Sequence, residues 1–163
     1  MSAGTIAATA RPRAFDTILL GGGIAGVLDG LDAVVFYGWS FNVRPAVLFQ
    51  HIASGLLGSR SLQEGWSTVF LGLACHFSIA IGAAAVFYVA SLVLPALWQR
   101  PWVFGPAFGV LVYLFMHYII VPLSAVPKRT VPVGVVELVD LLFSHTIFVG
   151  LPIALMARRS ARV

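Results

Sequence analysis

The chain has 163 residues, of which 60% are hydrophobic and 10% are charged, and its mean hydropathy is +0.97. Because a soluble domain usually contains about 45–50% apolar residues, this composition excludes a soluble or disordered chain. The formal net charge is +4. The basic residues are scattered at the ends and between apolar runs, so they indicate membrane topology, and no nucleic-acid partner is predicted.

The N-terminal region, residues 1–15, is small, polar and basic, and we interpret it as a cytoplasmic tail. A cleaved signal is not expected, because Asp29 and Asp32 interrupt the apolar stretch that follows. The first apolar run, about 17–39, is therefore predicted to be the first transmembrane helix, with Trp39 as an interfacial anchor.

Between the first two spans, the segment at about 45–57 begins with Pro45 and is followed by Gly58, which suits a short helix. This helix is too short to cross a bilayer and has one polar side, which includes His51. We predict an interfacial helix in the first outer loop, with His51 on the solvated side. A re-entrant hairpin is the alternative, and it requires protein cover.

Three later runs are predicted to span the membrane, at about 67–94, 102–121 and 133–157. The first of them has no formal charge and exceeds the roughly 20 residues that a crossing needs. The predicted fold is an all-α membrane protein. Residues 1–163 form one transmembrane domain, with four transmembrane helices in a compact bundle.

An even number of spans places both termini on one side of the membrane. With the termini inside, six basic residues lie inside and four lie outside, and this bias predicts cytoplasmic termini. The inner residues are Arg11, Arg13, Arg100, Arg158, Arg159 and Arg162, and the outer residues are Arg44, Arg60, Lys128 and Arg129.

Small residues recur at helical spacing within the predicted spans. The helix-packing positions are Gly22, Gly26 and Gly30 in the first span, Gly72 in the second, and Gly105 and Gly109 in the third. Small residues let helix backbones approach closely in a membrane. They predict close packing inside one bundle, but they would serve a homo-oligomer contact equally well.

Seven ionisable residues fall inside the predicted spans: Asp29, Asp32, His76, His117, Glu137, Asp140 and His145. A charged group near the bilayer centre costs about 2.5–3.5 kcal/mol, and no Lys or Arg lies in any predicted span. The available partners are therefore the histidines, other carboxyl groups, the backbone or a bound cation. Without such partners the deeper carboxyl groups are expected to be protonated.

At 1.5 Å per residue, all seven lie within about 17 Å of the outer helix ends. The side chains of Asp32, His76, His117, Asp140 and His145 are expected to form one polar layer there. Asp29 lies on the glycine stripe and meets His76 if the first two helices pack through their small faces. We therefore hypothesise that Asp29, His76 and His145 share a proton or hold a cation.

Structural alternatives stay open for the same residues. Glu137 is near its helix start, where a carboxylate complements the helix dipole and reaches water. Asp32 and Asp140 suit a wet vestibule, and His117 suits the membrane interface. His76 and His145 also suit simple hydrogen bonds to Ser144, Ser78 or the backbone. Asp29 also suits a protonated donor between helices.

Known enzyme motifs are missing from the sequence. GGGIAG resembles part of a dinucleotide fingerprint, but it lies in an apolar run with no preceding strand. The single cysteine, Cys75, forms no CxxC motif or internal disulfide. We predict no enzyme and no catalytic residue. The sequence requires no cofactor and does not identify a metal.

Five segments in order resemble an uncharacterised bacterial family of small four-span integral membrane proteins: GGGIAGVLDG, FQHIASGLLG, LGLACHFSIAIGAAAVFYVAS, VYLFMHYIIVPLSA and VGLPIALMARR. Asp29, His76 and His145 match this pattern, whereas His117 departs from it, because the pattern there more readily has Asn. The resemblance implies a four-span fold from about 17 to 159 in the bacterial cytoplasmic (inner) membrane. It implies no activity.

Two functional classes follow from these patterns. The first is a non-catalytic accessory or assembly subunit, because the chain is small, has short loops and carries glycine stripes. Its partners would be the lipid bilayer and either a second copy or a larger membrane complex. The alternative is binding or relay of a proton or divalent cation by the outer-half Asp/His layer. Haem binding is less favoured.

Overall fold

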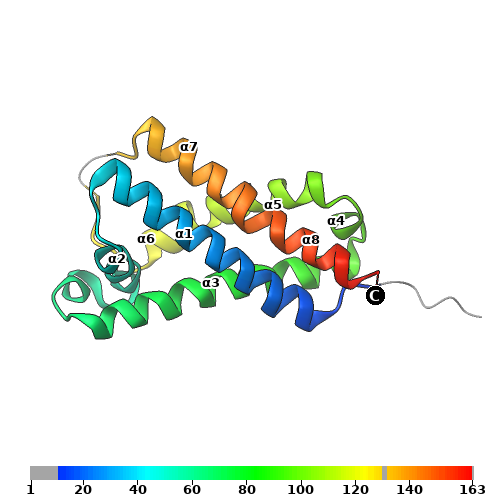
Figure 1. Cartoon of the computed structure of the whole chain (residues 1–163), viewed down its shortest axis with the longest axis horizontal. Coiled ribbons are helices and arrows are strands. Elements are labelled where there is room, and N and C mark those ends of the chain that lie inside the picture. Colours follow the sequence, from blue (N-terminus) through cyan, green and yellow to red (C-terminus); the bar gives the residue numbers. More distant parts are fainter. Residues whose placement is uncertain (1–10, 130–131, 163) are drawn as a thin grey trace, which may run out of the picture.

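The computed structural model describes residues 11–129 and 132–162, and within them the chain is helical without strands (Figure 1). Four helices are long and apolar enough to cross a membrane: Asp16–Phe41, Trp66–Val93, Pro101–Leu123 and Val135–Ser160. We call them spans 1 to 4. The prediction of an all-helical membrane protein with four such helices is confirmed. Most of the predicted N-terminal tail, residues 1–10, lies outside the described residues.

The spans contain shorter segments. Span 1 comprises η1 (Asp16–Gly21) and α1 (Gly22–Phe41), and span 2 is α3 (Trp66–Val93). Span 3 comprises α5 (Pro101–Phe115), η3 (Met116–Ile120) and α6 (Val121–Leu123). Span 4 comprises α7 (Val135–Phe143), η4 (Ser144–Gly150) and α8 (Leu151–Ser160). The connections carry α2 (Pro45–Leu57), η2 (Gly58–Leu62) and α4 (Ala96–Gln99).

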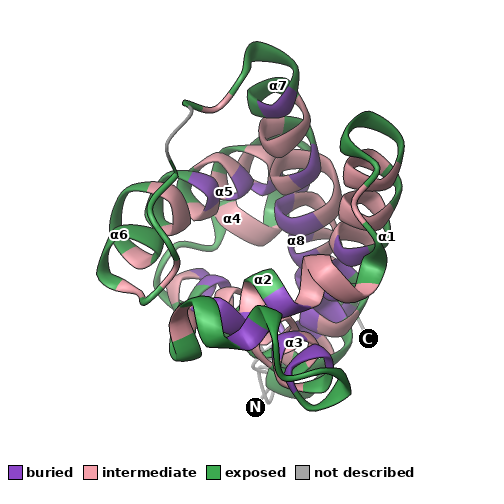
Figure 2. Ribbon diagram, turned by 90° about the vertical axis from the view of Figure 1, so that its left-hand side faces the viewer, coloured by how far each residue is buried: buried purple, intermediate pink, exposed green. Residues whose placement is uncertain are grey.

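The spans pack in a fixed order. Span 1 lies against spans 2 and 4, span 4 also lies against span 3, and α3 and α5 make few direct contacts. Both described ends of the chain lie at the end of the bundle that carries α4, where the backbone N–H of Arg13 donates to Ser160 Oγ at 3.0 Å. We call this the α4 end. The opposite end, where α2 packs along α3 (Figure 2), is the α2 end.

The main hydrophobic core fills the half of the bundle nearest the α4 end. Its largest members, Phe87 and Ile153, are fully buried among alanines of spans 1, 2 and 4. The ring of Phe87 meets that of Phe108 edge-on, with centroids 5.1 Å apart, and this contact joins spans 2 and 3. The bundle is therefore closed in this half.

The predicted small positions all contact other helices of the same chain. Gly22, Gly26 and Gly30 face α3, and Gly105 and Gly109 face span 4. Gly72 is different, because it packs against the backbone of Phe49 in α2 and not against another span. These six glycines allow close backbone approach within the monomer.

Two turns in spans 3 and 4 are widened into π-helix. The segments η3 and η4 end at Ile120 and Gly150, two residues before Pro122 and Pro152. A proline has no N–H to donate and its ring crowds the carbonyl four residues earlier, which favours a wider turn just before it. Pro106, near the start of α5, has no such turn. The widened turns carry Met116, His117, Ser144 and His145.

The helix α2 has the bounds expected from the sequence, but part of its polar side is covered by protein. Gln50 and Ser54 are buried, and Gln50 Nε2 donates to the carbonyl of Gly65 at 3.0 Å. His51 is exposed. Part of the polar stripe of α2 therefore holds the start of α3 in place.

The two glycines Gly72 and Gly82 of α3 provide a matched test of this packing. A Cβ at Gly72 overlaps the Phe49 carbonyl, whereas a Cβ at Gly82 meets nothing within 4 Å. We predict that Gly72→Ala destabilises the protein by about 1–3 kcal/mol through overpacking, while Gly82→Ala is neutral. Thermal unfolding of both purified variants in the same detergent measures this. Equal stability of the two variants would contradict the α2–α3 contact.

Candidate functional site

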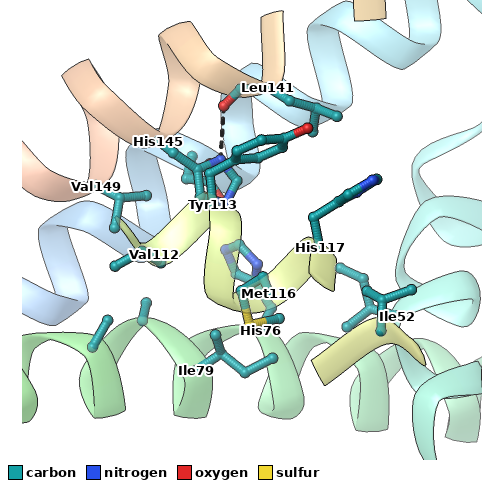
Figure 3. Close-up of a pocket in the computed structure, with 14 residues that line it drawn as sticks. Ile52, His76, Ile79, Val112, Tyr113, Met116, His117, Leu141, His145 and Val149 are labelled. Carbon is teal, nitrogen blue, oxygen red and sulfur yellow. Dashed lines mark hydrogen bonds between the residues drawn. The ribbon is translucent and has the colours of Figure 1, made fainter. Parts of the chain in front are cut away.

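A cavity of about 280 Å³ lies between the spans near the α2 end (Figure 3). Its polar side chains come from all four spans: Asp29, His76, Tyr113, His117 and His145. Its apolar wall consists of Ile52, Ile79, Ala80, Ala83, Val112, Met116, Val121, Leu141 and Val149. We call it the polar cavity. Four of the six predicted site residues line it, namely Asp29, His76, His117 and His145.

Asp29 is held by a neutral partner. The hydroxyl of Ser144, in the widened turn η4, donates to Asp29 Oδ1 at 2.7 Å. No Lys or Arg of the described residues pairs with Asp29. A carboxylate there has one hydrogen bond and no fixed counter-charge, so its ionised form needs a mobile cation.

His76 reaches span 1 by a different contact. Its Nε2 lies 2.8 Å from the carbonyl oxygen of Gly26, and because a carbonyl only accepts, Nε2 carries the proton and donates. The ring also lies beside Gly30, whose added Cβ would be 3.1 Å from Nε2. Within the described structure, Asp29 and His76 are not bonded to each other, although both line the polar cavity. Each is fixed by a separate partner.

His145, Tyr113 and His117 form an aromatic group on the other side of the cavity. The Nδ1 of His145 donates to the carbonyl of Leu141 at 2.9 Å. The Tyr113 ring stacks on His117 with centroids 5.5 Å apart and meets His145 edge-on at 5.7 Å. His145 presents its Nε2 as an acceptor when the ring is neutral, because the Nδ1 proton is committed.

Asp32 and Asp140 do not line the polar cavity. Asp32 lies three residues beyond Asp29 on α1, and its Oδ2 is buried with no hydrogen-bond partner among the described residues. Asp140 lies four residues before Ser144 in span 4. The predicted polar layer is therefore divided between the cavity and the neighbouring part of spans 1 and 4.

Glu137 was expected to reach water, and this expectation is wrong. Its side chain is buried, and it binds the guanidinium of Arg129 through two contacts of 2.7 and 2.9 Å. The hydroxyl of Tyr37 donates to the same carboxylate at 2.9 Å. Hydrogen bonding to Glu137 raises the pKa of Arg129, so the guanidinium stays charged. This cluster ties the loop before span 4 to span 1.

The sequence did not predict Tyr113, Met116 or Arg129 as site residues. Tyr113 and Met116 have the spacing of ordinary apolar positions in span 3, so nothing in the pattern distinguished them. A signal existed for Arg129, because it is a cation in a short loop eight residues before a carboxylate. In the part of the chain that the structure describes, no three His, Cys, Asp or Glu side chains are grouped to hold a metal ion.

Comparison with known proteins gives no match: no protein-family model, curated protein or solved structure is similar to this chain.

The Glu137 cluster predicts an asymmetric response to mutation. Arg129→Met leaves a buried carboxylate without its cation, which we expect to destabilise the protein by about 3 kcal/mol. Glu137→Gln costs less, because the half-exposed Arg129 can turn to water and Tyr37 keeps an acceptor. Thermal unfolding in detergent measures both variants. The double variant should be more stable than Arg129→Met alone, and additive losses would contradict the pairing.

Proposed function

We infer that this multi-pass membrane protein is a non-catalytic binding protein whose polar cavity takes up a proton or a cation at Asp29. The observation that carries this proposal is the position of Asp29. It lines a cavity in the membrane-spanning part of the chain, bound to a neutral hydroxyl and paired with no basic residue among those described. A charged carboxylate there is costly, so the group is expected to be either protonated or matched by a mobile cation.

The ligand chemistry of the cavity favours this over a bound transition metal or haem. The described residues offer no three-ligand metal group. His76 and His145 each donate a ring N–H to a backbone carbonyl, and Tyr113 contacts the rings of His117 and His145. A single carboxyl group among aromatic and apolar side chains suits a proton or a singly charged cation.

A carboxyl-directed reagent tests whether Asp29 is protonated and accessible. Dicyclohexylcarbodiimide reacts with protonated carboxyl groups in apolar surroundings. We expect it to modify Asp29 in the protein in nanodiscs. Peptide mass spectrometry locates the adduct.

The control is Glu64, an acidic residue in the connection before span 2, which should react little because it is partly exposed to water beside Arg60. Asp29→Asn should remove the adduct at position 29 without lowering the unfolding temperature greatly, since the amide can still accept from Ser144. No modification of Asp29 at any pH would contradict the proposed site.

For the membrane itself, we propose a bacterial cytoplasmic membrane with both termini inside and α2 at the outer surface. The excess of basic residues at the α4 end supports this orientation. Exposed tryptophans also lie near both ends of the spans, with Trp39 and Trp66 at the α2 end and Trp102 at the α4 end. Such residues favour the two membrane interfaces.

Labelling of single cysteines checks the orientation. In a Cys75→Ala background, a membrane-impermeant maleimide should modify Ser40→Cys in intact cells, because Ser40 is exposed at the α2 end. Gln99→Cys, exposed at the α4 end, should react only after the membrane is opened. The reverse pattern would mean that the polar cavity lies nearer the cytoplasmic side.

An accessory or assembly role, in a homo-oligomer or larger complex, remains a second proposal. The six glycines that suggested a partner surface pack within the chain, so they do not support a contact with another protein. Purification in mild detergent with cross-linking examines it directly. A stoichiometric membrane-protein partner would favour this role, and a monodisperse monomer would count against it.

A further inference from the structure

Beside the polar cavity lies a second, larger hollow on the side of the bundle. This groove, of about 900 Å³, runs between α3 and span 3 and shares Ile79, Ala83, Val112 and Met116 with the cavity wall. The rest of its lining is apolar or aromatic and includes the exposed side chains of Val86, Leu111 and Phe115. We call it the α3/α5 groove. It opens on the surface that membrane lipid would cover.

The groove has a clear structural origin. Spans 2 and 3 meet through Phe87 and Phe108 towards the α4 end, and otherwise make few direct contacts. Gly82 lies in the groove wall without any atom within 4 Å of its ideal Cβ position. Because Gly82 has no side chain, the groove is wider at this point of α3. The groove and the polar cavity therefore lie next to each other between the two spans, with four lining residues in common.

We propose that the site binds a lipophilic organic cation, an ammonium or phosphonium group with an apolar body, drawn from the bilayer through the α3/α5 groove. This inference rests on the proposed function and specifies its ligand. The apolar body would occupy the groove, and the positive group would lie beside Asp29. Binding to the protonated carboxyl releases its proton to water, so one positive charge replaces another.

The charges around the polar cavity favour an organic cation over an anionic lipid. Among the described residues, Asp29 and Asp32 make no ion pair with Lys or Arg. The ion-paired cations at the α2 end are already bound, Arg60 to Glu64 and Arg129 to Glu137. An anionic lipid head would be repelled by this arrangement. A small inorganic ion would need several oxygen ligands, which a largely apolar wall does not supply.

The aromatic group suits the same ligand. Tyr113 is 5% exposed and forms the inner wall of the cavity, with His117 stacked on it. The face of an aromatic ring attracts a cation within about 6 Å, and the attraction is stronger where water is excluded. An organic cation can thus be held by Asp29 and a ring face without a full shell of oxygen ligands.

Two ions of matched size and opposite charge test this inference. Radiolabelled tetraphenylphosphonium and tetraphenylborate are measured against the full chain in nanodiscs, with empty nanodiscs subtracted. We expect the cation to bind at least about tenfold more tightly than the anion. Equal binding of the two ions would overturn the inference, because it would mean that the groove recognises apolar bulk alone.

Matched variants assign the binding to the two parts of the site. Asp29→Asn should weaken cation binding at least about tenfold, whereas Glu64→Gln, which removes the same charge outside the spans, should not. Gly82→Trp should fill the α3/α5 groove and weaken binding, whereas Gly23→Trp, at an equally open glycine of α1, should leave it unchanged. Wild-type affinity in either Asp29→Asn or Gly82→Trp would overturn the proposal.

The carbodiimide reaction separates this inference from the proposed function. Tetraphenylphosphonium should protect Asp29 from modification, and tetraphenylborate should not. If Asp29 is modified but the cation neither binds nor protects, the site binds protons and the organic ligand is wrong. If Asp29 is never modified and the cation does not bind, both proposals fail.

Discussion

Close backbone approach at glycine is the contact on which this bundle depends. Helices in a bilayer gain little by hiding apolar side chains from each other, because lipid is equally apolar, so van der Waals packing has to hold them together. At Gly22 and Gly26, α3 packs closely against span 1. At Gly105 and Gly109, span 4 packs closely against α5. Gly72 does the same for α2. Each contact needs a residue without a Cβ.

The distribution of these contacts produces an asymmetric molecule. Alanines and Phe87 close the half near the α4 end, whereas α3 and span 3 separate towards the α2 end. The space left there includes the polar cavity, which histidine, tyrosine and aspartate side chains line within the membrane-spanning part of the chain. A bundle that was equally tight along its whole length would have no room for a ligand and no use for these costly polar groups.

Two carboxyl groups in the spans, those of Glu137 and Asp29, have different kinds of partner. Glu137 has a fixed cation in Arg129 and a hydroxyl donor in Tyr37, which suits a structural link between a loop and span 1. Asp29 has only Ser144. The contrast is the basis for proposing different roles, because the Glu137 carboxylate has a fixed cation and Asp29 has none among the described residues. The widened turn η4 supports the second role by presenting Ser144 and His145 side by side.

Much of the architecture could be predicted from local pattern. The length and apolarity of the four runs fixed the number of spans, since the hydrocarbon core demands about 20 apolar residues for each crossing. Glycine spacing identified the packing faces, and depth along the helices brought Asp29, His76, His117 and His145 to one level. Pro45 and Gly58 marked the ends of α2. These properties depend only on residues close together in the chain.

Which faces meet was decided by tertiary structure alone. The sequence paired Asp29 with His76, but Ser144 and the Gly26 carbonyl took these roles, because span 4 packs against span 1 as closely as α3 does. From the sequence Glu137 was expected to reach water, but Arg129 in the preceding loop binds it. The sequence did not single out Tyr113 or Met116, and it contained no sign of the α3/α5 groove. Helical periodicity fixes the direction of a side chain around its own axis, while a cavity depends on how four axes are arranged.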